Sequence, residues 1–336
     1  MRGDQVTIIV PVWNRRELLC RLLDGLDAQT WRPAEVLVID NGSGDGAPEL
    51  AEQRGARVVR MGSNTGFSRA VNRGIQECRT PWLALVNNDV EPAPDWLEQL
   101  CLAAAQHPDA WFFTGKILNA AERRRIDGTF DLVARSACAW RAGFGASEDA
   151  IFSTPRLVRS APGTAALFRT DLFTRIGLLE ESFESYLEDV DFGIRCACQG
   201  YAGWYVPAAR AWHQGSGTLG RWHADVVRRT ARNQVFLVAR HYPASLLARY
   251  FWSILVGQGL WGLVAFRHGC GWAFLRGKIA GLRLFRRVRK QSLLPDAPKL
   301  AAFLEEGERE LRNIQQQTGF NSYWRVYFWL TRGGTT

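Results

Sequence analysis

Three places in the sequence combine residue types that bind metal ions or move protons. The first is the triplet Asn87-Asn88-Asp89, which directly follows the apolar run at residues 82–86. A carboxylate beside amides suits a hard divalent cation such as Mg²⁺ or Mn²⁺, which would bridge the oxygens of a diphosphate and neutralise their charge. A solvated turn explains the same residues equally well, since Asn and Asp favour turns and Pro92 follows closely.

The second place is formed by Glu188, Asp189 and Asp191, which bring three carboxylates within four positions at the start of a predicted helix. Apolar neighbours such as Tyr186 and Leu187 would partly desolvate one carboxylate and raise its pKa toward the range useful for a general base. Acidic residues also compensate the positive end of the helix dipole, so the cluster has a purely structural explanation as well.

The third place is His213, which follows a predicted strand and precedes the glycine-rich stretch 214–218. A neutral imidazole there would complete a metal shell begun by Asp89, and the glycine-rich stretch behind it would form a mobile lid. The alternative is a histidine with a structural role only, which is the more common use of a single histidine.

The chain around these residues alternates between strand and helix patterns. Short apolar, β-branched runs indicate strands at 6–12, 35–39, 57–60, 82–86 and 110–117, and amphipathic segments indicate helices at 15–28, 47–54, 66–78 and 95–107. This alternation predicts an α/β fold with a Rossmann-like, doubly wound and mostly parallel sheet. Ligands bind beyond the carboxyl ends of the strands in such sheets, and both Asp40 and Asp89 fall there.

The pattern is less regular after residue 117. Residues 118–160 have poor periodicity and are expected to form long loops and an irregular hairpin, whereas 163–168 and 201–206 are expected to form strands, with a turn at 207–209. The sequence contains no P-loop, no G-x-G-x-x-G between a strand and a helix, and no G-x-S-x-G motif. NTPases, dehydrogenases and α/β-hydrolases are therefore disfavoured.

Seven sequence blocks resemble the family 2 inverting glycosyltransferases, which have the GT-A fold. In order they are PVWNR (11–15), VIDNGSGDG (38–46), NTGFSRAVNRGI (64–75), NNDVEP (87–92), GTAALFRTDLF (163–173), FESYLEDVDFGIRCACQGY (183–201) and VPAARAWHQGSGT (206–218). The resemblance covers about residues 4–220 and is greatest to the rhamnosyltransferase-like branch of bacterial polysaccharide biosynthesis. It implies a catalytic domain at 1–225, with a nucleotide-sugar-binding half at 1–117 and, at 118–225, an acceptor-binding half that carries the catalytic base.

The resemblance also implies a role for each motif residue. Asp189 is expected to be the base that deprotonates the acceptor hydroxyl, with Glu188 and Asp191 in support. Asp89 and His213 are expected to bind Mg²⁺ or Mn²⁺, with weaker affinity than usual because the Asn-Asn-Asp triplet has a single carboxylate. The residues expected to bind the nucleotide-sugar are Pro11, Trp13, Asn14, Asp40, Asn64, Gly66, Arg69, Asn72, Asn88 and Asp89.

The C-terminal region 226–336 is basic, rich in tryptophan and expected to be helical. The chain has a net charge of +9, yet residues 226–295 contain no acidic residue and interleave arginine with Trp, Phe and Leu. This pattern predicts amphipathic helices that lie on an anionic membrane surface. The apolar run 250–266 has about 17 residues, which is marginal for a span. A re-entrant or spanning element and a soluble helical appendage are the alternatives.

Together these features predict an inverting glycosyltransferase associated with a membrane. We expect it to transfer a sugar, with rhamnose as one candidate, from a dTDP- or UDP-linked donor to a lipid-linked or cell-surface glycan. The mildly acidic body and the lack of a recognition module argue against nucleic acid as a partner. Seven scattered cysteines and a strand that begins at residue 6 without an apolar signal segment predict a cytoplasmic protein, peripheral on the inner face of the cell membrane.

Two other functions share parts of this pattern. A sugar-nucleotide pyrophosphorylase has a similar nucleotide-binding sheet, but it would need a basic, glycine-rich loop after the first strand, where this chain has Pro-Val-Trp-Asn-Arg. A non-catalytic membrane scaffold of the same fold is the other alternative. The presence of Asp89, Asp189 and His213 together argues against it.

Overall fold

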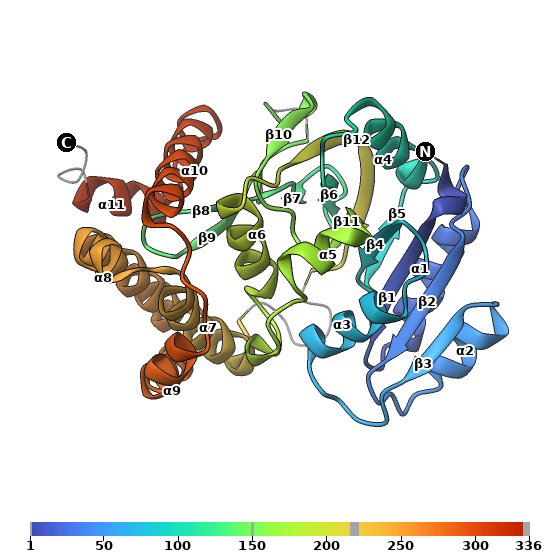
Figure 1. Ribbon diagram of the computed structural model, residues 1–336, viewed down its shortest axis with the longest axis horizontal. Helices are drawn as coiled ribbons and strands as arrows, with labels where there is room; N and C mark the ends of the chain where they lie inside the picture. Colours follow the sequence, from blue (N-terminus) through green and yellow to red (C-terminus); the bar gives the residue numbers. More distant parts are fainter. Residues whose placement is uncertain (1, 149–150, 216–221, 332–336) are drawn as a thin grey trace.

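A mixed ten-stranded sheet lies at the centre of the N-terminal two thirds of the chain (Figure 1). The computed structural model describes residues 2–148, 151–215 and 222–331. The strands are β1 (Val6–Val12), β2 (Glu35–Asp40), β3 (Arg57–Arg60), β4 (Trp82–Val86), β5 (Val90–Pro92), β6 (Phe112–Asn119), β7 (Ile126–Gly128), β8 (Asp131–Val133), β9 (Ala139–Arg141), β10 (Arg156–Val158), β11 (Ala165–Arg169) and β12 (Gly203–His213). Their order is β10-β12-β6-β11-β4-β1-β2-β3, with β5 added to β12 and β7 to β6, while β8 and β9 form a separate pair.

The four strands β3, β2, β1 and β4 are parallel, as expected. Strand β1 is buried along its whole length, because a β-branched run suits a strand that is covered on both faces. Val12 pairs with Asp40 at the end of this half of the sheet. The polar segments that follow β1, β2 and β4 therefore begin at the same edge.

The second half of the sheet is mixed, where a mostly parallel arrangement was expected. Strand β11 inserts between β4 and β6 and runs antiparallel to both. The turn expected at 207–209 is instead a bulge within one long strand, β12, whose register against β6 shifts between Val206 and Arg210. Pro207 has no N–H to donate to a ladder, and a bulge accommodates it.

Helices cover both faces of the sheet and divide the core in two. They are α1 (Arg16–Asp27), α2 (Ala47–Gln53), α3 (Phe67–Glu77), α4 (Trp96–Gln106), α5 (Thr170–Ile176) and α6 (Glu188–Cys198). Leucines of α1 and α4 pack with α2 against one face, and α3, α5 and α6 pack against the other. A short 3₁₀ helix, Glu181–Phe183, precedes α6, and two others are Gly3–Gln5 and Ile151–Ser153.

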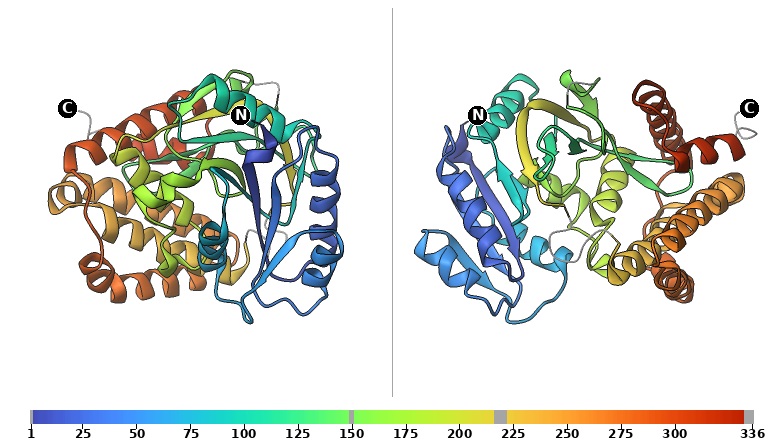
Figure 2. Two further views of the ribbon diagram at one scale, coloured as in Figure 1. Left: turned by 45° about the vertical axis from the view of Figure 1, so that its right-hand side comes forward. Right: turned by 180° about the vertical axis from the view of Figure 1, so that it is seen from behind.

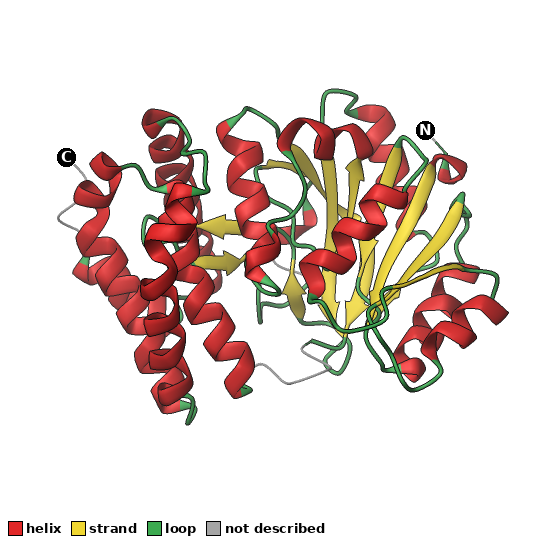
Figure 3. Cartoon of the chain, turned by 60° about the horizontal axis from the view of Figure 1, so that its bottom comes forward, coloured by secondary structure: helices red, strands yellow, loops and turns green. Residues whose placement is uncertain are grey.

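Five helices gather on the opposite side of the molecule from β1–β3 (Figures 2 and 3). They are α7 (Ala224–His241), α8 (Ala244–Arg267), α9 (Gly271–Lys290), α10 (Ala297–Thr318) and α11 (Ser322–Leu330). The β8–β9 pair is the irregular hairpin expected within 118–160, and a buried ion pair of 2.6 Å joins its Arg135 to Glu308 of α10. Among the helices of the described residues, none is both long enough and apolar enough to cross a bilayer.

The boundary expected after residue 225 stays a prediction. Helix α7 begins at Ala224, and its buried residues Phe236 and Leu237 share a core with Phe183 and Val190 of the catalytic region. The lid expected at 214–218 lies mostly outside the described residues, which stop at 215 and resume at 222.

Candidate active site

The polar segments at the carboxyl edge of the sheet contact one another. The side chain of Asn88, after β4, donates to the backbone carbonyl of Asn14, after β1, at 3.4 Å. Asn14 Oδ1 accepts from the N–H of Gly44, after β2, at 2.9 Å, and the Asp89 carbonyl accepts from the Gln214 N–H after β12. Four strand ends therefore form one site.

Hydrogen bonds fix the loop after β1, and Trp13 in this loop has an exposed side chain. Asn14 adopts a left-handed backbone with φ 60°, and its N–H donates to the Ser43 hydroxyl. Asp40 is buried and accepts from the Ser43 N–H at 2.9 Å. Pro11 lies inside β1, whereas the Trp13 side chain is 41% exposed and offers a ring face on which a base can stack.

The predicted donor residues 64–72 divide into two groups. Asn64 and Gly66 lie beside β2, because the Asn41 amide donates to Asn64 Oδ1 at 3.1 Å and to the Gly66 carbonyl at 3.2 Å. Arg69 forms an ion pair with Glu181, and the buried Asn72 amide is bonded to the backbone of Leu179. The last two side chains connect α3 to Leu179 and Glu181, and their contact with a donor stays a prediction.

Asp89 and His213, the predicted metal ligands, lie side by side, and their binding of a metal stays a prediction. Asp89 Oδ1 is 3.3 Å from His213 Nε2, and both side chains are about nine-tenths buried. Asp127 of β7 holds the other ring nitrogen, Nδ1, at 2.8 Å. Burial alone would lower the pKa of His213, but hydrogen bonds to Asp127 and Asp89 and their negative charges raise it to about 9.

The donor atoms of this pair fit Mn²⁺ or Mg²⁺. The Asp89 carboxylate is an oxygen ligand of the kind that Mn²⁺ and Mg²⁺ prefer, the His213 imidazole would add one nitrogen, and diphosphate oxygens and water would supply the remaining ligands. A carboxylate that accepts from the second ring nitrogen of a ligating histidine fixes the ring and raises its basicity. Asp127 occupies this position at His213. Within the described residues, no three His, Cys, Asp or Glu side chains gather into a complete metal site, so the donor's diphosphate would have to contribute ligands.

The three carboxylates at the start of α6 have three different environments. Asp189 is partly exposed, and its two oxygens accept from the N–H groups of Val190 (2.9 Å) and Gly163 (3.1 Å). Glu188 is buried, and its Oε2 has no hydrogen-bond partner. Burial raises the pKa of Glu188 and the charge of Asp189 raises it further, which favours a protonated side chain. Asp189 is therefore the accessible carboxylate of the cluster.

Asp191 is fully buried and is bonded to two arginines and one histidine. Its carboxylate accepts from Arg195 at 3.0 Å, Arg240 at 2.7 Å and His241 at 2.8 Å. Burial would raise the pKa of Asp191, but the charge of Arg195 and the contacts with His241 and Arg240 hold it well below its usual range. These contacts tie the first turn of α6 to α7, and support of the base by Asp191 stays a prediction.

Replacing Asp191 by alanine is expected to lower the free energy of unfolding by about 3–5 kcal/mol, because it leaves buried cations without a counter-charge. The folded-state pKa is depressed, so this stabilisation is complete at neutral pH and is lost as the pH falls below about 4. Urea denaturation of the wild-type protein and the variant at pH 7 and at pH 3 measures the difference and its loss in acid. Asp171→Ala, which breaks an exposed ion pair, is the matched control; an equal loss in the two variants at pH 7 would contradict the assignment.

Three residues of this site were not predicted from the sequence. Strand β9 pairs Arg141 with Asp131 of β8, and Arg141 also lies 3.5 Å from Asp127. Asp131 is buried with one oxygen lacking a hydrogen-bond partner; burial raises its pKa, and so does the charge of Asp189 nearby. Gly128 lets Arg141 cross β7, since a Cβ there would lie 1.9 Å from the arginine Cδ. The one sequence signal for these residues was the spacing of Asp127 and Asp131, two aspartates four positions apart on either side of Gly128.

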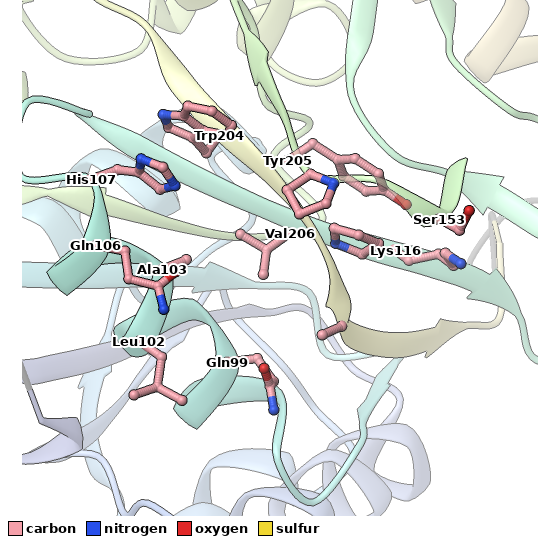
Figure 4. A pocket seen from close by; sticks show the side chains of 13 residues that line it. Gln99, Leu102, Ala103, Gln106, His107, Lys116, Ser153, Trp204, Tyr205 and Val206 are labelled. Carbon is pink, nitrogen blue, oxygen red and sulfur yellow. The ribbon is translucent and has the colours of Figure 1, made fainter. Parts of the chain in front are cut away.

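A cavity of about 520 Å³ between α4 and β12 lies apart from these residues (Figure 4). Its wall includes His107 stacked on Trp204, with ring centroids 3.9 Å apart, together with Lys116 and Gln99. None of the residues predicted to bind donor, acceptor or metal lines it. The residues predicted to form the site therefore lie outside this cavity, at the strand ends and the start of α6.

Comparison with known proteins gives a family match over the first half of the chain, which includes Asp40, Asp89 and Asp127. Residues 7–177 match the model described as glycosyl transferase family 2. The chain is 28% identical over 268 residues to the N-acetylglucosaminyl-diphospho-decaprenol L-rhamnosyltransferase of Mycobacterium tuberculosis, which spans 71% of this chain and 85% of the relative. It is 34% identical over 101 residues to glycosyltransferase AglE of Haloferax volcanii, which covers 28% of this chain and 33% of that protein.

Two solved structures share the fold. GalNAc-T7 with UDP, GalNAc and Mn²⁺ superposes with a TM-score of 0.62 at 16% identity over 94% of this chain, which spans only 58% of that one. The mannosyltransferase PcManGT of Pyrobaculum calidifontis, in complex with GDP-Man and Mn²⁺, gives a TM-score of 0.53 at 18% identity and covers 97% of this chain and 86% of its own. At these identities the likeness establishes the GT-A fold.

Proposed function

This chain belongs to glycosyl transferase family 2 and is a glycosyltransferase with the GT-A fold, and we propose that it moves a sugar from a nucleotide-diphospho-sugar to a hydroxyl of a lipid-linked glycan. The observation that carries the proposal is a continuous acidic site. Asp89 contacts His213, and His213 contacts Asp127. Arg141 lies within ion-pair distance of both Asp127 and Asp131, and Asp131 is near enough to Asp189 for the charge of Asp189 to raise its pKa. These contacts support a single site, with Asp89 and His213 at its donor end and Asp189 as its accessible carboxylate.

The arrangement suits a single displacement with inversion. The oxygen of the acceptor hydroxyl attacks the anomeric carbon while Asp189 accepts the hydroxyl proton, and the nucleoside diphosphate leaves from the opposite face. The N–H groups of Gly163 and Val190 hold the carboxylate in place. A divalent cation, when bound by Asp89 and His213, neutralises the charge that develops on the departing diphosphate.

The substrates are proposed by analogy with the relatives. The mycobacterial relative is named for transfer of L-rhamnose to N-acetylglucosaminyl-diphospho-decaprenol, so a deoxyhexose such as rhamnose, linked to dTDP or UDP, and a polyprenyl-diphosphate-linked acceptor are the first candidates. Mn²⁺ in the two structural neighbours supports a divalent cation, either Mn²⁺ or Mg²⁺. The match to glycosyl transferase family 2 does not support the alternative function of a sugar-nucleotide pyrophosphorylase.

A panel of nucleotide-sugars tests the proposal without an acceptor. Each of the dTDP-, UDP- and GDP-linked sugars is added to the protein with and without Mn²⁺, and the melting temperature is recorded. One donor class is expected to raise it in a concentration-dependent way, and more so with Mn²⁺, since a ligand that binds only the folded state stabilises it by mass action. A panel in which no nucleotide-sugar shifts the melting temperature would overturn the proposal.

The C-terminal helices are proposed to contact the inner face of the cell membrane. Large apolar side chains that are at least half exposed lie on α8, α9 and α11: Phe251, Trp252, Leu255, Leu263, Phe266, Trp272, Leu282 and Trp329. Arginines lie among those of α8 and α9, within residues 226–295, which contain no acidic residue, and this suits anionic lipid.

Sedimentation with vesicles measures this contact. The protein is expected to pellet with vesicles that contain phosphatidylglycerol and much less with purely zwitterionic ones. The double change Trp252→Ser and Trp272→Ser is expected to weaken the binding, because it removes two exposed rings that would insert at the interface. Equal recovery of the wild-type protein with and without vesicles would contradict the contact.

A further inference from the structure

The segment 182–187, which leads into the helix that carries Asp189, has an unfavourable backbone. Three residues other than glycine have left-handed φ angles here: Glu184 (61°), Tyr186 (73°) and Leu187 (68°). Each costs free energy and persists only where the surrounding structure determines it. Leu187 is the N-cap of α6, so the path of this segment sets where Asp189 lies.

Asn233 of α7 holds three carbonyl groups of this segment. Its side chain is completely buried, and its Nδ2 lies within hydrogen-bond distance of the carbonyl oxygens of Phe183 (2.9 Å), Ser185 (3.0 Å) and Tyr186 (2.7 Å), which share its two hydrogens. The Asn233 Oδ1 accepts from Arg232 Nε at 2.9 Å. Because a guanidinium only donates, this contact fixes which end of the amide faces the segment.

Arg232 holds the same segment from the adjacent position. Its Nη2 donates to the carbonyls of Ser182 (3.2 Å) and Phe183 (2.9 Å), and its Nη1 forms a 2.8 Å ion pair with Glu184. The side chain is 8% exposed. Buried carbonyls left without a donor are costly, so the two side chains stabilise a path that the backbone alone disfavours.

The segment is also held from the nucleotide-binding half. The carbonyl of Glu184 accepts from the N–H of Ser68, in the first turn of α3, at 3.0 Å. Gly66 just before it is in close contact with the same residue, since a Cβ there would lie 3.2 Å from the Glu184 carbonyl oxygen. Segment 182–187 thus lies between α3 on one side and Arg232 and Asn233 on the other.

Helix α9 packs against α7 next to Arg232. A Cβ at Gly277 would lie 2.2 Å from the Arg228 carbonyl oxygen, and one at Gly281 would lie 3.0 Å from the Arg232 carbonyl oxygen. The two helices therefore cross nearly backbone to backbone next to Arg232. Displacement of α9 would be transmitted directly to the residues that hold the segment.

We propose that Arg232 and Asn233 are positioning residues for the transfer reaction, which hold segment 182–187 so that Asp189 reaches the acceptor hydroxyl. Helix α7 then supports the active site through these two side chains, in addition to any contact of the C-terminal helices with a membrane. The inference rests on the proposed role of Asp189 as the base. It adds a separate claim, that the segment keeps its path only while α7 supplies these donors.

Asn233→Ala tests the inference, with Gln234→Ala as the matched control. Gln234 is the next residue of α7 and is equally buried, but its side chain contacts Cys138 and Lys278 and makes no hydrogen bond to segment 182–187. Asn233→Ala is expected to lower kcat about 10²-fold, the size of effect that a small misplacement of a reacting group produces, with little change in the donor's KM. Gln234→Ala is expected to keep kcat near the wild-type value at a comparable melting temperature.

Hydrogen exchange supplies a readout that does not depend on activity. The N–H groups of Ser68, Glu184 and Ser185 are expected to exchange faster in Asn233→Ala than in Gln234→Ala. Arg232→Lys, which keeps a cationic donor, should retain more activity than Arg232→Met. Equal kcat and equal exchange at the segment in the two alanine variants would overturn the inference. If the wild-type protein transfers no sugar but the exchange difference appears, the support of the segment stands and the proposed function fails.

Discussion

Asp189→Asn is expected to reduce the rate of sugar transfer by about 10²–10⁴-fold, the contribution usual for a positioned general base. The amide has nearly the same shape as the carboxylate but cannot accept the proton of the acceptor hydroxyl. Its single oxygen can still accept from one of the two N–H groups, those of Gly163 and Val190, that hold the carboxylate. The fold and the donor affinity are therefore expected to persist, which isolates the chemical step. Single-turnover transfer and the donor's dissociation constant measure the two effects.

Glu188→Gln is the control for this variant. Glu188 is the neighbouring carboxyl group, but burial and the charge of Asp189 raise its pKa and favour the protonated form, so it is a poor base. We expect a clearly smaller loss than in Asp189→Asn. If Glu188→Gln abolished transfer while Asp189→Asn retained it, the base would be Glu188 and the assignment would be wrong.

Asp89→Ala is expected to weaken Mn²⁺ binding by more than about 10-fold and to lower kcat by about 10²–10³-fold. Asp89 is the only carboxylate in its triplet, and its Oδ1 lies 3.3 Å from His213 Nε2, so the variant leaves one of two adjacent donor atoms. Mn²⁺ titration followed by electron paramagnetic resonance reports the affinity independently of activity.

Asp127→Asn is the graded comparison for the metal site. The asparagine oxygen can still accept from His213 Nδ1–H, but the negative charge that supports the ring is lost. We expect a loss of Mn²⁺ affinity smaller than that of Asp89→Ala. Full transfer activity in the presence of a chelator, together with no detectable Mn²⁺ binding, would show that the enzyme works without the metal.

The parallel half of the fold was predictable because its strands are buried on both faces. The β-branched runs at 6–12 and 35–39 leave little ambiguity, and the structure has β1 and β2 within a residue of those bounds. The direction of β11 was not predictable, since a strand that returns from a long irregular region carries no local sign of its orientation. The bulge at 207–209 was taken for a turn because proline fits either one.

The proximity of the predicted site residues could be inferred where a motif lies at a strand end. Asp89 and His213 are adjacent in the structure although 124 positions separate them in the sequence. Asp127, Asp131 and Arg141 were missed because they lie on three short strands within an irregular stretch. Arg232 and Asn233 were missed for a different reason: the charge of residues 226–295 was attributed to membrane contact, and only the structure places α7 against segment 182–187.

The most direct test of the account is transfer to a defined acceptor. The protein is incubated with the nucleotide-sugar that stabilises it, Mn²⁺ and a synthetic polyprenyl-diphosphate-linked N-acetylglucosamine, and the product is analysed by mass spectrometry and by NMR of the new anomeric centre. We predict a product one sugar heavier whose anomeric configuration is opposite to that of the donor, and none with Asp189→Asn. Retention of the donor's configuration, or equal product from the variant, would contradict a single displacement with Asp189 as the base.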